Sequence, residues 1–258
     1  MEGKSITALV SRIGTTRLHA LFAQAPQRAA PWVHALAADG VLQAQVCYGR
    51  MLLEGHGVDR DATAALTWFR RAAACGDADA VNMMGRCLDN GWGTPEDAAR
   101  ATEHFQRAAL AGHAWAQYNL GHMYFDGRGV ARDRAKAFAC YTQAAAQGHE
   151  RAMNLLGRCC EEGWGTPRDL QASSDWYRRS AEGGYFRGQY NWGTLLLKAR
   201  RFNEAARWLE RAAAGGGARS GGAASNGAAA VRRAVLALIT RAGVPGELQE
   251  LALRLQET

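Results

Sequence analysis

The chain has 258 residues, a formal net charge of +7 and a hydrophobic content of 48% that is drawn largely from alanine. Alanine suits closely stacked helices better than a large globular interior, and no stretch approaches the roughly 20 apolar residues that a membrane span requires. The composition therefore argues against a membrane protein, while the basic balance is compatible with an acidic protein, a nucleic acid or an anionic membrane surface as partner.

The N-terminal segment, residues 1–39, is expected to form a cap and a degenerate half repeat. Its first residues lack a long apolar run and a clear cleavage site, so we expect no secretory signal and a cytoplasmic protein. Pro31 fits the first turn of a helix, where its missing N–H costs nothing. Asp39 and Gly40 then close this half repeat.

Residues 40–216 repeat with a period of 36 residues. The markers are unit-closing, internal and paired loop glycines and one aspartate per unit: Gly40, Gly76, Gly112, Gly148 and Gly184; Gly49, Gly85, Gly121, Gly157 and Gly193; Gly55/Gly57, Gly91/Gly93, Gly127/Gly129 and Gly163/Gly165; Asp61, Asp97, Asp133 and Asp169. A fixed period of this length is typical of a stacked array in which each unit covers its neighbour's apolar face. The period therefore predicts an α-solenoid of about five repeats.

Each full unit is predicted to consist of a helix A, a glycine loop and a helix B. In the first unit helix A covers about residues 42–53 and helix B about 62–75, because apolar residues recur there at helical spacing. Gly55 can end helix A with a positive φ, and Asp61 stands where a helix N-terminus favours an acceptor. The recurring aromatic residues of helix B are predicted to be packing residues: Phe69, Phe105, Tyr141 and Tyr177.

The pattern is clearest over Ala116–Gly148, which reads A-x-x-x-L-G-x-x-Y-x-x-G-x-G-V-x-x-D-x-x-x-A-x-x-x-Y-x-x-A-A-x-x-G. This stretch resembles the Sel-1-like repeat (SLR), a longer-looped branch of the tetratricopeptide (TPR) superfamily, and the resemblance covers about residues 40–216. It implies an all-α fold, a right-handed superhelix of stacked antiparallel helix pairs. It also implies an adaptor that holds other proteins and has no catalytic residues.

The fifth unit departs from the pattern because four residues of its loop are missing, so residues 185–216 are predicted to form an ordinary tetratricopeptide hairpin. Small and polar residues predict a flexible linker at 217–227. Residues 228–258 read as two helices that form a C-terminal cap on the last repeat. Docking on a partner is the alternative for their apolar faces.

The side chains of helix A that do not pack on helix B are the candidate binding residues. By helical geometry they share the opposite face, which lines the concave groove in tetratricopeptide-like solenoids. The candidates are Arg50, Asn82, Arg86, Trp115, Tyr118, His122, Asn154, Arg158 and Tyr190. Asparagine can hydrogen-bond a peptide backbone, arginine can clamp a carboxylate, and aromatic rings supply contact area. We therefore expect a protein or peptide partner with acidic side chains or a terminal carboxylate; a solvated face without a ligand is the alternative.

Repeats two and four are more alike than neighbouring repeats are. GRCLDNGWGTPED at 85–97 and GRCCEEGWGTPRD at 157–169 lie 72 residues apart. Duplication of a repeat pair, or selection for two similar sites, would each explain this longer period. Trp92 and Trp164 stand between loop glycines, where they either pack within the loop or contact a partner.

Neither the cysteines nor the sequence motifs indicate catalysis or a metal site. The six cysteines show no C-x-x-C spacing and are predicted to be free thiols in a reducing compartment: Cys47, Cys75, Cys87, Cys140, Cys159 and Cys160. No phosphate loop, nucleophile elbow, zinc-protease motif or dinucleotide fingerprint is present. We therefore expect no enzyme activity, no cofactor and no metal.

The predicted function is a cytoplasmic, non-enzymatic scaffold or adaptor that binds a partner segment in its groove. A nucleic-acid-binding helical repeat protein and a regulatory subunit of an enzyme are the alternatives. The excess of arginine favours nucleic acid, but acidic residues interrupt the basic face and argue against tracking along phosphates: Asp79, Asp89, Asp126, Glu161 and Glu162.

Overall fold

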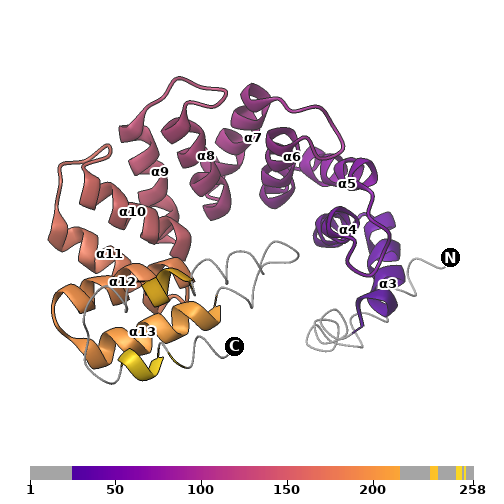
Figure 1. Ribbon diagram of the computed structural model, residues 1–258. Coiled ribbons are helices and arrows are strands. Elements are labelled where there is room, and N and C mark those ends of the chain that lie inside the picture. The colour runs from indigo at the N-terminus through magenta and orange to yellow at the C-terminus, as the bar shows by residue number, and fades with distance from the viewer. Residues whose placement is uncertain (1–24, 216–232, 238–247, 252, 254–258) are drawn as a thin grey trace. The chain divides into compact units, whose positions relative to one another are not determined.

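The computed structural model describes residues 25–215, 233–237, 248–251 and 253, and Figure 1 shows its helices. In this part of the chain every regular element is a helix and no strand occurs. The chain divides into two compact units, Met1–Arg132 (unit 1) and Asp133–Thr258 (unit 2). The all-α solenoid fold of consecutive helix pairs is thus confirmed. Residues 1–24 of the predicted cap and the linker predicted at 217–227 lie outside the described residues.

From residue 25 onward, unit 1 consists of a single helix, two helix pairs and the A helix of a third pair. Each helix packs against the next one along the chain. The helices are α3 (Pro26–Ala38), α4 (Leu42–Glu54), α5 (Ala62–Ala74), α6 (Ala78–Asn90), α7 (Ala98–Leu110) and α8 (Ala114–Asp126).

Unit 2 contains the B helix of the third repeat and the last two pairs, again packed in chain order. Its helices are α9 (Arg134–Ala146), α10 (Glu150–Glu162), α11 (Leu170–Glu182), α12 (Phe186–Lys198) and α13 (Phe202–Gly215). In both units together, the A helices are α4, α6, α8, α10 and α12, and the B helices are α5, α7, α9, α11 and α13.

Helix ends follow the repeat markers. Helix α6 ends at Gly91, whose φ of 67° is the left-handed conformation that favours glycine. Helix α7 then begins at Asp97, whose carboxylate accepts a 3.0 Å hydrogen bond from the Arg100 amide. The other three aspartates of this series also cap B helices: Asp61, Asp133 and Asp169. The predicted capping role of this series is confirmed.

The A helices α8 and α10 begin at a histidine cap. The Nδ1 of His113 accepts a 3.1 Å hydrogen bond from the Ala116 amide, and that of His149 accepts a 3.2 Å bond from the Ala152 amide. The equivalent cap of α6 is Asp77. These two histidines therefore act on helix ends as an acidic or hydroxyl cap would.

The second glycine of each loop lies against the start of the preceding repeat's B helix. A Cβ added at Gly93 would overlap the carbonyl group of Ala62, the first residue of α5. The same overlap would occur at the other three loops: Gly57 on Pro26, Gly129 on Ala98 and Gly165 on Arg134. Each glycine loop thus packs directly on the backbone of the preceding repeat. This close contact explains why glycine recurs at the position.

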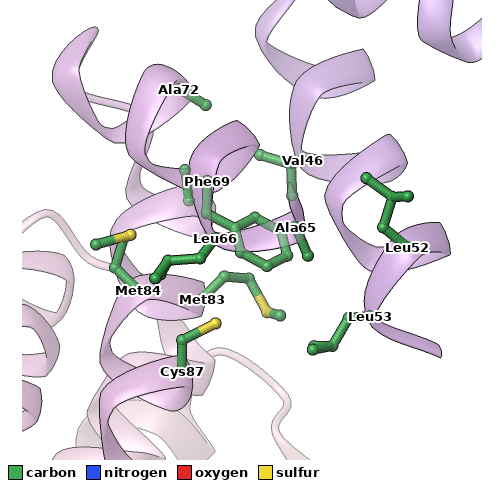
Figure 2. Packing of buried hydrophobic residues seen from close by; sticks show 11 residues of the cluster. Val46, Leu52, Leu53, Ala65, Leu66, Phe69, Ala72, Met83, Met84 and Cys87 are labelled. Atoms are coloured by element: carbon green, nitrogen blue, oxygen red, sulfur yellow. The ribbon is translucent and has the colours of Figure 1, made fainter. Parts of the chain in front are cut away.

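Apolar residues of three successive helices, α4, α5 and α6, form a core cluster in unit 1. Figure 2 shows Phe69 of α5 between side chains of α4 and α6, with Met83 and Cys87 nearby. Phe69 is fully buried, and a Cβ at Gly49 would lie 2.5 Å from its ring. The internal glycine therefore lets the ring approach the A helix. The packing role predicted for the B-helix rings is confirmed, because all four are buried: Phe69, Phe105, Tyr141 and Tyr177.

The last pair has no glycine loop. Helices α12 and α13 are joined by a short turn in which Arg200 adopts a φ of 60°. Beyond this pair, Val235, Leu248 and Leu251 are at most 1% exposed and pack with residues of α12 and α13. The described part of the C-terminal segment therefore covers the apolar surface of the last pair.

The remaining sequence expectations concern the thiols, metals and membranes. All six cysteines fall among the described residues and none forms a disulfide. Cys87 and Cys159 are buried, and Cys87 belongs to the core cluster of unit 1. The described residues contain no group of three histidine, cysteine or carboxylate side chains suited to a metal. Of the helices they form, none has the length and apolar character needed to cross a membrane.

Candidate functional site

The candidate residues lie on the side of the A helices formed by Gln43, Val46 and Arg50 and by the equivalent positions of the later repeats, which we call the A face. In unit 1 the A face belongs to α4, α6 and α8, and in unit 2 to α10 and α12. The structure divides the nine predicted groove residues into buried residues that hold A helices together and half-buried or exposed residues on the surface.

Arg50 is joined to the next A helix. Its guanidinium donates hydrogen bonds of 2.6 and 2.8 Å to the two carboxylate oxygens of Asp79, which also lies 3.5 Å from Nε2 of His113. Burial works to raise the pKa of Asp79, but the hydrogen bond with His113 and the charge of Arg50 outweigh it and lower that pKa. This half-exposed ion pair contributes at most about 1 kcal/mol, because water screens both groups. Arg50 therefore carries an internal counter-ion.

Asn82 and Asn154 are not where they were predicted to be. They are only 3% and 5% exposed, so the expectation that they project from an unpacked face is wrong. Asn82 accepts a 2.9 Å hydrogen bond from Asn119 of α8, and Asn154 accepts a 2.8 Å bond from Asn191 of α12. Each asparagine faces the A helix of the following repeat, a neighbour that a helical wheel drawn for one repeat leaves out. The two bonds tie successive A helices together.

Sequence reasoning missed Asn119 and Asn191, the donors of these two ties. A signal was present, since Tyr-Asn occurs at 118–119 and again at 190–191 with the 72-residue spacing of their partners. The Tyr of each dipeptide remains half-buried on the A face. At these positions the 72-residue period therefore corresponds to hydrogen bonds between the A helices of successive repeats.

Arg86 and Arg158 lie over the two loop tryptophans. The Cζ of Arg86 is 5.1 Å from the ring centroid of Trp92, and that of Arg158 is 5.1 Å from the ring of Trp164. Both rings are half-buried, and Trp92 packs against the core cluster of unit 1. The loop tryptophans therefore support arginines of their own A helices, as in the loop-packing alternative.

A second cation reaches Trp164. Arg134, the first residue of α9, has its Cζ 5.6 Å from the centroid of this ring. In the sequence Arg134 stands at the end of one loop. In the structure its backbone lies against Gly165, and this contact places Arg134 beside the next loop. Trp164 is thus in contact with cations from α9 and α10.

An aromatic row occupies the α8 part of the A face. The rings of Trp115 and Tyr118 are 5.9 Å apart and those of Tyr118 and His122 are 4.6 Å apart, both edge to face. Trp115 is 42% exposed. Burial, together with Arg128, lowers the pKa of His122 below its usual 6.5, although Asp126 and Asp89 act in the opposite direction. Burial therefore favours the neutral form of the His122 ring.

Asp89 and Arg128 form a salt bridge near the C-terminal end of helix α6. Nη2 of Arg128 lies 2.6 Å from Oδ1 of Asp89 and 3.2 Å from its backbone oxygen. Burial nevertheless raises the pKa of Asp89 above its ordinary value. Asp79 and Asp89 are thus each engaged with a neighbouring cation.

The A face of unit 2 carries more positive charge. Arg151 lies 5.7 Å from the ring centroid of Tyr185, and Arg187 lies 5.7 Å from that of Phe186. Neither Arg158 nor Arg187 forms a salt bridge with a described carboxylate. Tyr190 is half-buried against the cluster of the last pair. This face offers several guanidinium groups, each set against a ring.

Comparison with known proteins agrees with this architecture. The Sel1 repeat matches residues 42–77, 78–113, 116–149, 150–185 and 187–217. A search of curated proteins gave no match.

Among solved structures, a Sel1 repeat protein from Oxalobacter formigenes is similar with a TM-score of 0.66 and 27% identity, over 72% of this chain and 76% of that one. The protective antigen c5321 of uropathogenic Escherichia coli, which displays an SLR fold, is similar with a TM-score of 0.61 and 25% identity. That match covers 90% of this chain and 56% of the antigen. The immunity protein PA5088 from Pseudomonas aeruginosa is similar in fold, with a TM-score of 0.58 and 15% identity over 86% of this chain and 83% of that one.

Proposed function

The chain belongs to the Sel1 repeat family, and on this premise we propose that it is a non-enzymatic adaptor that holds an acidic segment of another protein on its A face. Sel1 repeat proteins generally act as protein-interaction scaffolds. The finer part of the proposal, the face and the chemistry of the partner, is supported by the side chains of this chain.

The observation that carries the proposal is the pair of ring-supported arginines. Arg86 lies over Trp92 and Arg158 over Trp164 at the same distance of 5.1 Å. Stacking engages the flat side of a guanidinium, whereas a carboxylate binds at its edge through two parallel N–H donors. A ring beneath the group also restricts its rotamers, so less entropy is lost when a ligand binds. We propose that the edge of each guanidinium that points away from its ring receives a carboxylate.

Aromatic residues of the A face favour a protein partner. Trp115 is 42% exposed, and Tyr118 and Tyr190 are half-buried, so their rings can add contact area at low entropic cost. Carboxylates on the A helices of each unit, such as Asp79 in unit 1 and Glu162 in unit 2, would repel a phosphate backbone. A segment with separated acidic side chains can avoid them.

Binding of the native partner tests the proposal. Partners captured from the source cells would be identified, purified and titrated against wild type and the double variant Arg86→Ala with Arg158→Ala. A matched control, Arg107→Ala with Arg207→Ala, removes the same charge from exposed positions of B helices α7 and α13. A lost charge-assisted hydrogen bond is worth about 1.5–3 kcal/mol, so the A-face variant should bind at least about tenfold more weakly.

The control variant should bind within about twofold of wild type, because an exposed charge away from the contact changes affinity little. Equal weakening by both double variants, together with loss of capture after nuclease treatment, would instead indicate a nucleic-acid ligand held by diffuse charge. An unchanged affinity of the A-face variant would disprove the proposal.

A further inference from the structure

The A face carries the same arrangement twice, once in each unit. In unit 1 it comprises the Asn82–Asn119 bond and the Arg86–Trp92 stack. In unit 2 the Asn154–Asn191 bond and the Arg158–Trp164 stack take the same places, 72 residues further on. The hydrogen bonds differ by 0.1 Å (2.9 and 2.8 Å) and the stacking distances are equal.

The repeat between them does not contain this arrangement. Position by position, His122 stands where Arg86 and Arg158 stand, and Arg128 replaces the loop tryptophan. The arginine–tryptophan stack therefore occurs in alternate repeats, and each copy is complete within its own unit.

The buried amide pair positions the parts of each copy. A buried asparagine is costly unless it is hydrogen-bonded, and its partner here belongs to the A helix of the following repeat. The bond fixes the register between the helix that carries the arginine and the helix that carries the next tyrosine. Tyr118 and Tyr190 are the residues immediately before the two asparagine donors. Each copy of the arrangement thus combines an arginine from one repeat with a tyrosine from the next.

The two copies differ in charge. Asp79 in unit 1 corresponds to Arg151 in unit 2, and Trp115 corresponds to Arg187. Asp79 neutralises Arg50 through hydrogen bonds of 2.6 and 2.8 Å. The corresponding carboxylate in unit 2 is absent, and Arg151 and Arg187 each lie 5.7 Å from an aromatic ring.

The A-face positions of unit 2 contain no carboxylate, whereas those of unit 1 include Asp79. Glu161 and Glu162 lie at the end of α10, beyond these positions, and Glu161 accepts a 2.7 Å hydrogen bond from the hydroxyl of Tyr177. The unit 2 copy therefore presents a more positive surface than the unit 1 copy.

From this duplication we infer that the chain has two separate sites for acidic protein segments, one in each unit, and that the unit 2 site binds them more tightly. The inference rests on the proposed function and adds a stoichiometry and an order of affinities to it. One chain then holds two acidic segments at once, from two partner molecules or from one partner that carries two.

Calorimetric titration with a defined probe tests this. The probe is a short peptide rich in aspartate and glutamate, acetylated and amidated so that side chains supply its only carboxylates; its amide counterpart, with asparagine and glutamine, is the control ligand. Wild type should bind two acidic peptides per chain with unequal affinities and should not bind the amide peptide. Arg158→Ala should weaken the tighter event at least about tenfold and Arg86→Ala only the weaker one.

A charge exchange gives a gain of function. Asp79→Arg with Trp115→Arg gives unit 1 the residues of unit 2, so the weaker event should tighten about tenfold or more. The reverse exchange, Arg151→Asp with Arg187→Trp, should weaken the tighter event. Far-ultraviolet circular dichroism would verify that each variant keeps its helices.

The outcomes separate this inference from the proposed function. One peptide per chain, weakened equally by Arg86→Ala and Arg158→Ala, would overturn the two-site inference and leave an adaptor with a single site. Absence of acidic-peptide binding, while the native partner still depends on these arginines, would overturn the inference alone. Failure of the native partner to respond to the double variant is the separate result that removes the proposed function.

Discussion

Asn119 donates a 2.9 Å hydrogen bond to the buried Oδ1 of Asn82, and this bond joins the A helices of two successive repeats in unit 1. In a repeat array the interfaces between neighbouring repeats contribute to stability, so a hydrogen bond across such an interface affects more than one repeat.

Asn82→Ala should reduce the free energy of unfolding by about 1–3 kcal/mol, because Asn119 loses its partner in a largely buried place. The measurement is urea denaturation followed by circular dichroism. The double variant Asn82→Ala with Asn119→Ala should lose less than the sum of the single losses. Additive losses would show that the two amides do not interact.

Gly85→Ala should destabilise unit 1, because the new Cβ would lie 2.7 Å from the ring of Phe105. Overpacking of this kind costs about 1–3 kcal/mol. Combination with Phe105→Leu, which makes room, should lose less stability than the two changes separately predict. A thermal midpoint for Gly85→Ala equal to that of wild type would show that the ring moves without cost.

Stability should fall as the pH is lowered through the range in which His122 takes up a proton. Burial and Arg128 lower the pKa of His122 in the fold, so the unfolded chain binds this proton first, from its ordinary 6.5 downward. The contribution of neutral His122 to the free energy of unfolding is complete above pH 6.5 and is lost as the pH falls through the pKa of His122 in the folded state. His122→Phe, which keeps a ring beside Tyr118, should show a flatter pH dependence of denaturation than wild type.

Leu251→Ala should destabilise the last helix pair by about 2–5 kcal/mol, since this side chain is 1% exposed in the cluster with α12 and α13. Leu253→Ala is the matched control, because Leu253 is 60% exposed only two residues away. Its denaturation should remain close to wild type. Similar losses for both leucines would contradict the placement of the C-terminal segment.

Cys75 should react first with iodoacetamide in the native protein near neutral pH. It is exposed, whereas burial raises the pKa of Cys87 to about 11 and, with the neighbouring Cys160, that of Cys159 to about 12. The thiolate is the reactive form, so the buried thiols should react slowly. Unfolding without a reductant should expose all six, as counted by mass spectrometry; a count below six would reveal a disulfide.

The fold was readable from the sequence because local constraints recur in every unit. Gly91 must adopt a positive φ and Asp97 must cap a helix, and each requirement restricts the residue type at one position. Phe69 could likewise be assigned to the core from the period of helix B alone. Each of these features depends only on residues within one repeat.

The A face was only partly readable, because it depends on contacts between repeats. Asn82 was expected to project outward, yet the neighbouring A helix covers it. Arg134, at the far end of a loop in the sequence, lies against Trp164 of the following loop. Helical periodicity separates the faces of one helix but does not indicate which neighbour covers each face.

The turn between α12 and α13 has a consequence for the preceding repeat. The backbone carbonyl groups of the first residues of four earlier helices lie against a glycine of the following loop: Pro26, Ala62, Ala98 and Arg134. The equivalent position in α11 is Leu170, which has no such loop after it and is 58% exposed. The boundaries between repeats are therefore not equivalent. An engineered array that includes the boundary between the fourth and fifth repeats would lack the glycine-loop contact at that position. Grafting a four-residue glycine loop beside Arg200 is the change that would make the last boundary like the others.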